Sequence, residues 1–343
     1  MNKTFRRALV FTLAFLLLGS IGVFGQAIEL DLMKENFSGF SSDVATALPH
    51  AAATGLTWSD ARVRGFPHFG VGLSLGAVMI PKDTFVDLAD TMNIALPSEI
   101  TDSELGVPFP AYAVDARLGI PFLPFDVGAK LGMLTPEMSE SLGGKVNADY
   151  MLAGFEIRYP IIKGNLLLPA VSLSAGYNYL SGGIGMTVDN AGDLAGGISF
   201  DVPDDGTYTV DYTDPELRFD WQTQAVDFKV QTSKNLLIFT PYIGGAYSYG
   251  WSKAGGGVSA ELTYAKDGNS VNEDDVRKAL DELGYDVDLS DQGFVVLSSV
   301  DGGSIRAFGG LSVNLLLLKL DVNGQYNFTT SSLGAGVNAR IQF

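Results

Sequence analysis

The chain has 343 residues, a net charge of −17 and no cysteine. The lack of cysteine excludes a disulfide scaffold, a cysteine zinc site, a thiol nucleophile and a lipid anchor on an N-terminal cysteine. Because the chain has only two histidines, a metal site built from several histidines is not expected, and no cofactor is expected either. The excess of acidic residues argues against nucleic acid as a partner.

The N-terminus has the three-part layout of a secretory signal peptide. Basic residues precede an apolar stretch from Ala8 to Leu18, and small residues at Gly25 and Ala27 offer cleavage points. A single membrane anchor is the alternative, but the stretch is short and no stop-transfer charges follow it. We therefore expect residues 1–27 to be a signal peptide. After Ala27 no apolar run is long enough for a spanning helix, so a membrane crossing would need strands.

Residues 28–65 form an N-terminal lead-in or plug ahead of the strands. Apolar residues recur here at helical spacing, which predicts a short amphipathic helix over 31–48, namely Phe37, Phe40, Val44, Ala45 and Leu48. Such a helix could plug the lumen of a barrel, cap its periplasmic mouth, lie on a membrane surface, or be only a lead-in. The sequence leaves these four roles open.

Both histidines lie in or just after this segment. His50 or His68 together with Asp60 is a conceivable proton-transfer pair. No serine in a nucleophile-elbow context accompanies them, and histidines often serve as structural hydrogen-bonding groups. A catalytic site is not expected.

From residue 66 onward the sequence alternates with a period of two. Between Leu123 and Met133 the odd positions are apolar and the even positions are small or charged, which indicates a strand with one apolar face. The same split predicts ten strands, at about 66–80, 111–120, 122–133, 147–160, 166–180, 217–232, 236–251, 304–315, 317–328 and 332–343. These lengths suit a tilted membrane crossing better than a soluble sheet.

Two parts of the pattern are less regular than the rest. In 217–232 the residues Phe219 and Trp221 share one phase and Phe228 and Val230 the other, so a bulge is expected. The runs Val258–Ala265 and Phe294–Ser298 also look like strands, and the count becomes twelve if both enter the wall.

The connections are unequal in length. Short leucine-rich turns follow every second strand, whereas residues 83–110, 182–215 and 252–303 make long connections, two of them acidic. Short turns at one end and long loops at the other are typical of outer-membrane barrels. The fold class is therefore all-β, a transmembrane antiparallel up-and-down β-barrel over 66–343 with short periplasmic turns, long extracellular loops and both termini at the periplasmic side.

The inward face of this barrel carries many charges. They are Asp115, Arg117, Asp126, Lys130, Glu156, Arg158, Arg306, Lys319, Asp321 and Arg340. In a narrow bore buried charges must pair, which gives a filled lumen with an ion-pair network. A charge-selective channel is the alternative, because inward glycines such as Gly70, Gly128 and Gly334 would leave room for water.

The last residues alternate and end in an aromatic carboxyl terminus, at Val337, Ala339, Ile341 and Phe343. This pattern resembles the assembly signal of bacterial outer-membrane barrel proteins, although Ala339 is smaller than the bulky residue common there. The resemblance implies that the last strand is read by the barrel-assembly machinery. The stretch from Leu48 to Gly76 also resembles spirochaetal outer-membrane proteins of unassigned function.

These observations predict a non-enzymatic protein of the cell outer membrane. It would contact outer-membrane lipids, expose acidic loops at the surface, and either pass small solutes or hold an extracellular ligand of unknown identity. The alternatives are an outer-membrane hydrolase with a site at the loop rim and a soluble secreted β-sandwich.

Overall fold

The computed structural model describes residues 30–83, 85–87, 101–135, 146–187, 198–202, 205–212, 216–259, 262–282 and 293–343. The expected signal peptide, residues 1–27, lies outside these ranges. No helix in the described ranges is long and apolar enough to cross a membrane.

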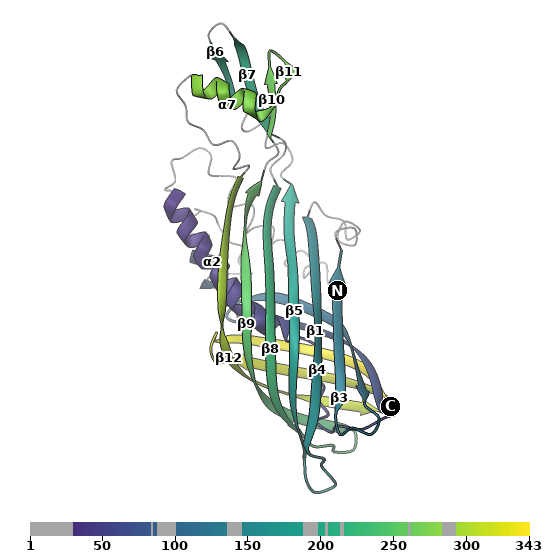
Figure 1. Ribbon diagram of the computed structural model, residues 1–343. Helices are drawn as coiled ribbons and strands as arrows, with labels where there is room; N and C mark the ends of the chain where they lie inside the picture. Colours follow the sequence, from purple (N-terminus) through teal and green to yellow (C-terminus); the bar gives the residue numbers. More distant parts are fainter. Residues whose placement is uncertain are drawn as a thin grey trace.

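Ten antiparallel strands close into one barrel, with the order β1-β14-β13-β12-β9-β8-β5-β4-β3-β2 (Figure 1). Their bounds are β1 Phe69–Ile80, β2 Val107–Gly119, β3 Asp126–Leu134, β4 Val146–Ile162, β5 Ala170–Thr187, β8 Glu216–Ser233, β9 Phe239–Ser259, β12 Gly293–Leu315, β13 Leu318–Asn327 and β14 Ser332–Gln342. A closed ring of strands confirms the up-and-down barrel and excludes the two-sheet sandwich.

The outer surface of the barrel is apolar, as a membrane crossing requires. In β14 the side chains alternate between buried and exposed along the whole strand. The exposed set includes Leu333, Val337 and Ile341, whereas Asn338 and Arg340 between them are buried inside. Apolar residues face outward and polar residues face the lumen, which is the reverse of a soluble protein and typical of a barrel in lipid.

One side of the barrel wall is much taller than the other. The strands β5, β8, β9 and β12 have 18, 18, 21 and 23 residues, against 9 for β3 and 10 for β13. The tall strands extend past the short ones at the end opposite the short turns (Figure 1). In the extended part, the inner surface of the tall strands has no short strands opposite it.

The two runs that could have added wall strands do not do so. Val258 lies at the end of β9, and Phe294–Ser298 belongs to the start of β12, where the two strands pair from Gly293↔Ser259 onward. A separate four-stranded sheet, in the order β11-β10-β7-β6, lies above the barrel (Figure 1). It consists of β6 Ile198–Val202, β7 Gly206–Tyr212, β10 Leu262–Lys266 and β11 Asn269–Ser270, with helix α7 Glu273–Glu282.

This loop sheet has its own small core. Val276 and Ala279 of α7 pack on Val202 and Tyr208 of the sheet. The sheet joins two connections that are far apart in sequence, because β10 pairs with β7. The long-loop end therefore carries a folded module.

Strand β8 runs without the expected bulge. Its register against β5 and β9 is continuous over the whole strand, and the one register shift in the described wall pairings lies in β4, between Pro160 and Ile162. Phe219 and Trp221 are simply buried on the inner face, while Phe228 and Val230 face outward. The strand keeps one phase throughout. Its inner face is apolar around Phe219 and Trp221, and it is charged at the level of Phe228 and Val230.

Helix α2, Leu30–Ala52, lies against the inner face of the tall wall and contacts mainly β9, β12 and β8. Phe40 packs on Phe219 of β8 and on Phe85, with ring centroids 5.4 Å apart in both pairs. Ser38 shares a hydrogen bond with Ser298 near the start of β12. The described part of the chain thus begins near the long-loop end. The first residue of β1 and the last residue of β14 lie at the short-turn end. The two ends of the barrel itself lie together at the short-turn side, as the even strand count predicts, since the Phe343 amide donates to the Phe69 carbonyl.

Candidate functional site

The chain between α2 and β1 passes down through the barrel lumen. Because α2 lies at the long-loop end and β1 starts at the short-turn end, the connecting residues must cross the interior. Residues 53–65, here named the plug, do so without regular secondary structure. Leu56, Trp58 and Ala61 of the plug are almost completely buried.

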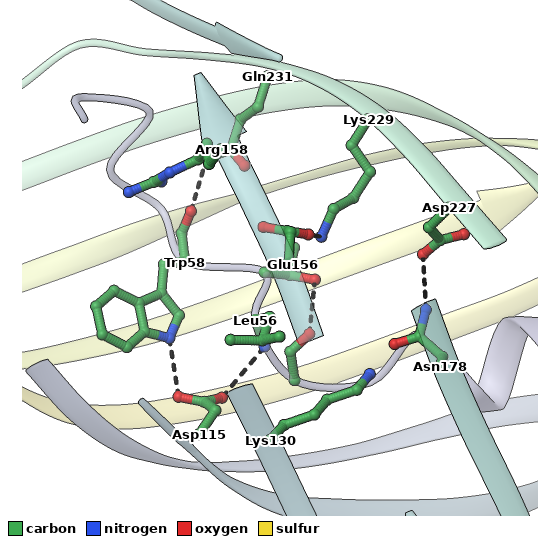
Figure 2. A network of polar contacts seen from close by, with 12 residues as sticks. Leu56, Trp58, Asp115, Lys130, Glu156, Arg158, Asn178, Asp227, Lys229 and Gln231 are labelled. Carbon is green, nitrogen blue, oxygen red and sulfur yellow. Dashed lines mark hydrogen bonds and ion pairs between the residues drawn. The ribbon is translucent and has the colours of Figure 1, made fainter. Parts of the chain in front are cut away.

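Trp58 is held from three sides of the lumen. Its indole Nε1 donates a hydrogen bond of 2.9 Å to the Asp115 carboxylate on β2. The guanidinium groups of Arg117 and Arg340 lie 5.5 and 4.9 Å from the ring centroid. Figure 2 shows the indole pointing at Asp115, which also accepts from the Leu56 amide. An indole between two cations and a carboxylate combines burial, cation–π attraction and a charge-assisted hydrogen bond.

Wall side chains bind the carbonyl groups of the plug. Buried backbone groups need partners, and a coil inside a barrel has no neighbouring strand to supply them. Lys130 Nζ donates to the carbonyl of Thr54 in the plug and to that of Ala52, the last residue of α2, each at 2.6 Å. Further carbonyls are bound by Arg117 at Leu56, Gln231 at Trp58 and Arg158 at Asp60. The wall thus supplies a polar lining that fits one path of the chain.

The remaining lumen charges pair with one another. Arg117 and Arg158 both bind Asp126, at 3.1 and 2.6 Å, and Glu156 bridges Arg117 and Lys229. On other parts of the wall Arg306 pairs with Asp227 at 2.7 Å, Arg340 pairs with Asp321, and Lys319 lies 3.8 Å from Asp60 of the plug. Figure 2 shows the Glu156–Lys229 pair beside Leu56 and Trp58 of the plug. Paired charges of this kind are costly to break singly, because the partner would stay buried and uncompensated.

Two of the inward glycines, Gly70 and Gly128, make room for the plug. A Cβ atom at Gly70 would lie 2.7 Å from the Trp58 ring, and one at Gly128 would lie 2.7 Å from Leu56. Beside the plug a cavity of about 20 Å³ adjoins Thr54 and Ser74, which is room for about one water. The expectation that these glycines open a pore does not match their contacts.

Above the plug the lumen is closed by apolar packing. Phe40, Val44 and Leu48 of α2 form one cluster with Phe219 and Trp221 of β8. His50, at the end of α2, has its Nδ1 atom 3.0 Å from the Ser332 hydroxyl. A charged layer around the plug and an apolar layer around α2 together fill the interior.

All ten residues expected to line the lumen are buried within the barrel. Eight of them form ion pairs, and the other two, Asp115 and Lys130, bind the plug. The four residues of the expected assembly signal face outward on or just after β14, which closes the ring against β1. Phe343 also donates its backbone N–H to the Phe69 carbonyl at 2.8 Å.

The histidines and Asp60 have separate partners. His68 contacts the backbone carbonyl of Phe343 and the Gln342 amide, and His50 contacts Ser332. Asp60 lies near Lys319 and accepts from the Arg62 amide. In the described residues these groups serve the packing of the plug against the wall, and no group of three or more potential metal ligands is found there.

Four important residues were absent from the lumen predicted from the sequence. Asp227 and Lys229 alternate with the outward Phe228 and Val230, so the period of two could have identified them once the bulge was dropped. Trp58 and Asp60 lie in a coil without periodicity, and their burial could not be predicted from spacing.

No protein-family model and no curated protein matches the chain. Solved structures with a similar fold include the outer membrane protease OmpT from Escherichia coli, with 9% identity, a TM-score of 0.34, and coverage of 81% of this chain and 97% of that one. The translocator domain of autotransporter NalP from Neisseria meningitidis has 8% identity, a TM-score of 0.34, and coverage of 82% and 89%. The Ralstonia pickettii toluene transporter TbuX has 12% identity, a TM-score of 0.21, and coverage of 87% and 92%. At these TM-scores none of them assigns an activity to this chain.

Proposed function

We propose that this chain is a non-enzymatic integral protein of the outer membrane whose barrel is closed by its own N-terminal segment. The barrel then acts as an anchor that holds the loop sheet and α7 outside the cell. The observation that carries this proposal is the plug, since its carbonyls and the Trp58 ring are bound by the wall on several sides. On this proposal, α2 and the plug block the route that solutes would take through the described part of the barrel.

Recording from planar bilayers tests the closed barrel. The folded wild-type protein should give little or no steady current. A variant that lacks residues 30–65 loses both α2 and the plug, and it should conduct if it folds as judged by heat-modifiable gel migration. Large, stable single-channel steps from the wild-type protein would contradict the proposal.

A gated small-solute channel is the second candidate. The plug is a separate chain segment, and the wall holds it through hydrogen bonds of side chains to its carbonyls, which can exchange with water. Its release would expose Lys130, Arg158 and Asp321 to solvent. Current that begins only after a solute or a membrane potential is applied would favour the channel, and charge reversal at these three residues should then change ion selectivity.

A hydrolase with a site at the loop rim is the enzymatic alternative. Against it, His50 contacts Ser332 and His68 contacts Phe343, and both imidazoles are buried, so neither is open to a substrate at the loop rim. Replacing both histidines should leave any phenotype largely intact, and the loss of a measured hydrolytic activity with an intact barrel would overturn the non-enzymatic proposal. The outer-membrane location and the spirochaetal affinity stay predictions, and fractionation of cells tests the first.

A further inference from the structure

The four short turns present large apolar side chains in the open. Phe122, Leu167, Leu237 and Leu316, here named the apolar rim, have exposed fractions of 106%, 87%, 96% and 98%. They lie one in each turn at the short-turn end of the barrel. Turns in water are normally built from polar residues and glycine, so a ring of four exposed apolar tips needs an explanation.

Turn geometry does not explain the rim. Phe122, Leu237 and Leu316 have positive φ angles of 64°, 55° and 56°. Glycine and asparagine adopt this conformation more easily than a bulky apolar residue. Leucine and phenylalanine are therefore present despite the backbone, which indicates that the side chain itself has a favourable environment.

Several backbone groups of the turns have hydrogen-bond partners within the protein. Asn165 Oδ1 accepts from the amides of Leu167 and Leu168, both at 2.8 Å. Lys234 Nζ, from the neighbouring turn, donates to the carbonyls of Asn165 and Leu166 at 3.1 and 2.8 Å. The Ile238 carbonyl accepts from the Asn314 amide at 2.7 Å. Backbone groups that enter lipid must be satisfied within the protein in this way.

The spacing of the rim places it within the thickness of an apolar band. Tyr177, Tyr247 and Tyr326 each follow a rim leucine by ten residues, on the strand that leaves its turn. Seven or eight of these ten steps along the chain lie within the strand, because β5, β9 and β13 begin at Ala170, Phe239 and Leu318, and at a tilt of 45° they rise about 17–19 Å. The apolar band of outer-membrane barrels is roughly 25 Å thick, and its edges carry aromatic girdles. With the tyrosines at one edge of the band, the rim therefore lies inside the opposite edge.

We propose that the apolar rim is inserted among lipid acyl chains of the leaflet on the short-turn side. The rim is continuous with the lipid-facing surface of the wall, since Leu315, Leu317 and Leu318 around Leu316 are exposed as well. The barrel therefore sits low in the bilayer, with its short-turn end below the headgroup level and its tall wall projecting from the opposite leaflet. Lys163, exposed in one of these turns, suits the phosphate groups of that leaflet, because a long lysine side chain can reach the interface.

Depth-dependent quenching tests the proposal, and the cysteine-free chain makes single labelling clean. Leu237→Cys and Leu316→Cys are each labelled with an environment-sensitive fluorophore and folded into phosphatidylcholine–phosphatidylglycerol vesicles. Spin labels on the acyl chains should quench both as strongly as a label at the lipid-facing Val322, and iodide present on both sides should quench them weakly. Quenching by iodide to the level of a label at Asp274, exposed on α7, with none from the acyl chains, would overturn the proposal.

Leu237→Asn gives an independent result. Asparagine suits the positive φ at this position, so a turn in water would keep or gain stability. A turn in lipid would lose apolar burial, and the equilibrium constant for folding into vesicles should fall about tenfold. An unchanged or larger constant would contradict the insertion of the rim.

Discussion

Replacing Trp58 should release the plug while the barrel stays intact. The indole is almost completely buried and is held by Asp115, Arg117 and Arg340. Removing a buried tryptophan side chain typically costs about 3–5 kcal/mol. A value of about 4 kcal/mol corresponds to a roughly thousandfold change in the equilibrium between a seated and a released plug.

The reactivity of a thiol reports this equilibrium. Ala61→Cys places one cysteine on a fully buried position of the plug, and its modification by a water-soluble maleimide requires the plug to open. Trp58→Ala should raise the rate by up to about a thousandfold. Trp251→Ala is the matched control, because that ring is half exposed on the outer surface. If the thiol in folded protein reacts at the same rate with and without the Trp58→Ala substitution, then the contacts of the indole do not hold the plug in the lumen.

Three further changes have defined outcomes. Lys130→Met removes two charge-assisted hydrogen bonds, one to Thr54 of the plug and one to Ala52 at the end of α2. At about 2 kcal/mol lost, the same thiol should react about thirtyfold faster, whereas Lys253→Met, exposed on the outer wall, should not change the rate. Deleting Phe343 should impair membrane assembly more than export, because the residue pairs with Phe69 where the ring closes; normal surface assembly of the truncated protein would show that the C-terminal pattern was misread. In the loop sheet a hydrogen bond from the Lys266 ammonium lowers the pKa of Asp205. This contact therefore stabilises the loop sheet above the usual carboxyl pKa of about 3.9, and the stabilisation is lost as the pH falls through the lowered pKa. Proteolysis of the loop sheet should increase at acidic pH while the barrel stays folded, and an unchanged cleavage rate would contradict the coupling.

The barrel was predictable because its strands obey one rule. Where lipid covers the outside and polar groups fill the inside, the period of two is strong, as between Leu318 and Asn327. The rule fails where the interior changes from a charged layer to the apolar layer around α2. Phe219 and Trp221 on β8 then resemble outward residues although they face the helix. The alternation within one strand cannot reveal which other segment of the chain packs on its inner face.

The candidate site was predictable only in part. The sequence placed ten charges on the inner wall, because each strand dictates the side on which a residue lies. It could not give the path of residues 53–65, whose position depends on where α2 is anchored. It also could not give the pairing of β7 with β10, since strands in separate loops carry no sequence signal for one another.

A disulfide between the plug and the wall tests the central claim most directly. A Cβ atom at Gly55 would lie 3.7 Å from that of Ala113 on β2, within the range that a disulfide needs. Gly55 has a φ of 84°, where a side chain adds strain, so Gly55→Ala in folded, heat-modifiable protein is the control for that strain. In the cysteine-free chain, Gly55→Cys combined with Ala113→Cys should cross-link under mild oxidation in the membrane, and the product should stay electrically silent. Two free thiols that both react with a maleimide in folded, heat-modifiable protein would show that residues 53–65 do not occupy the lumen.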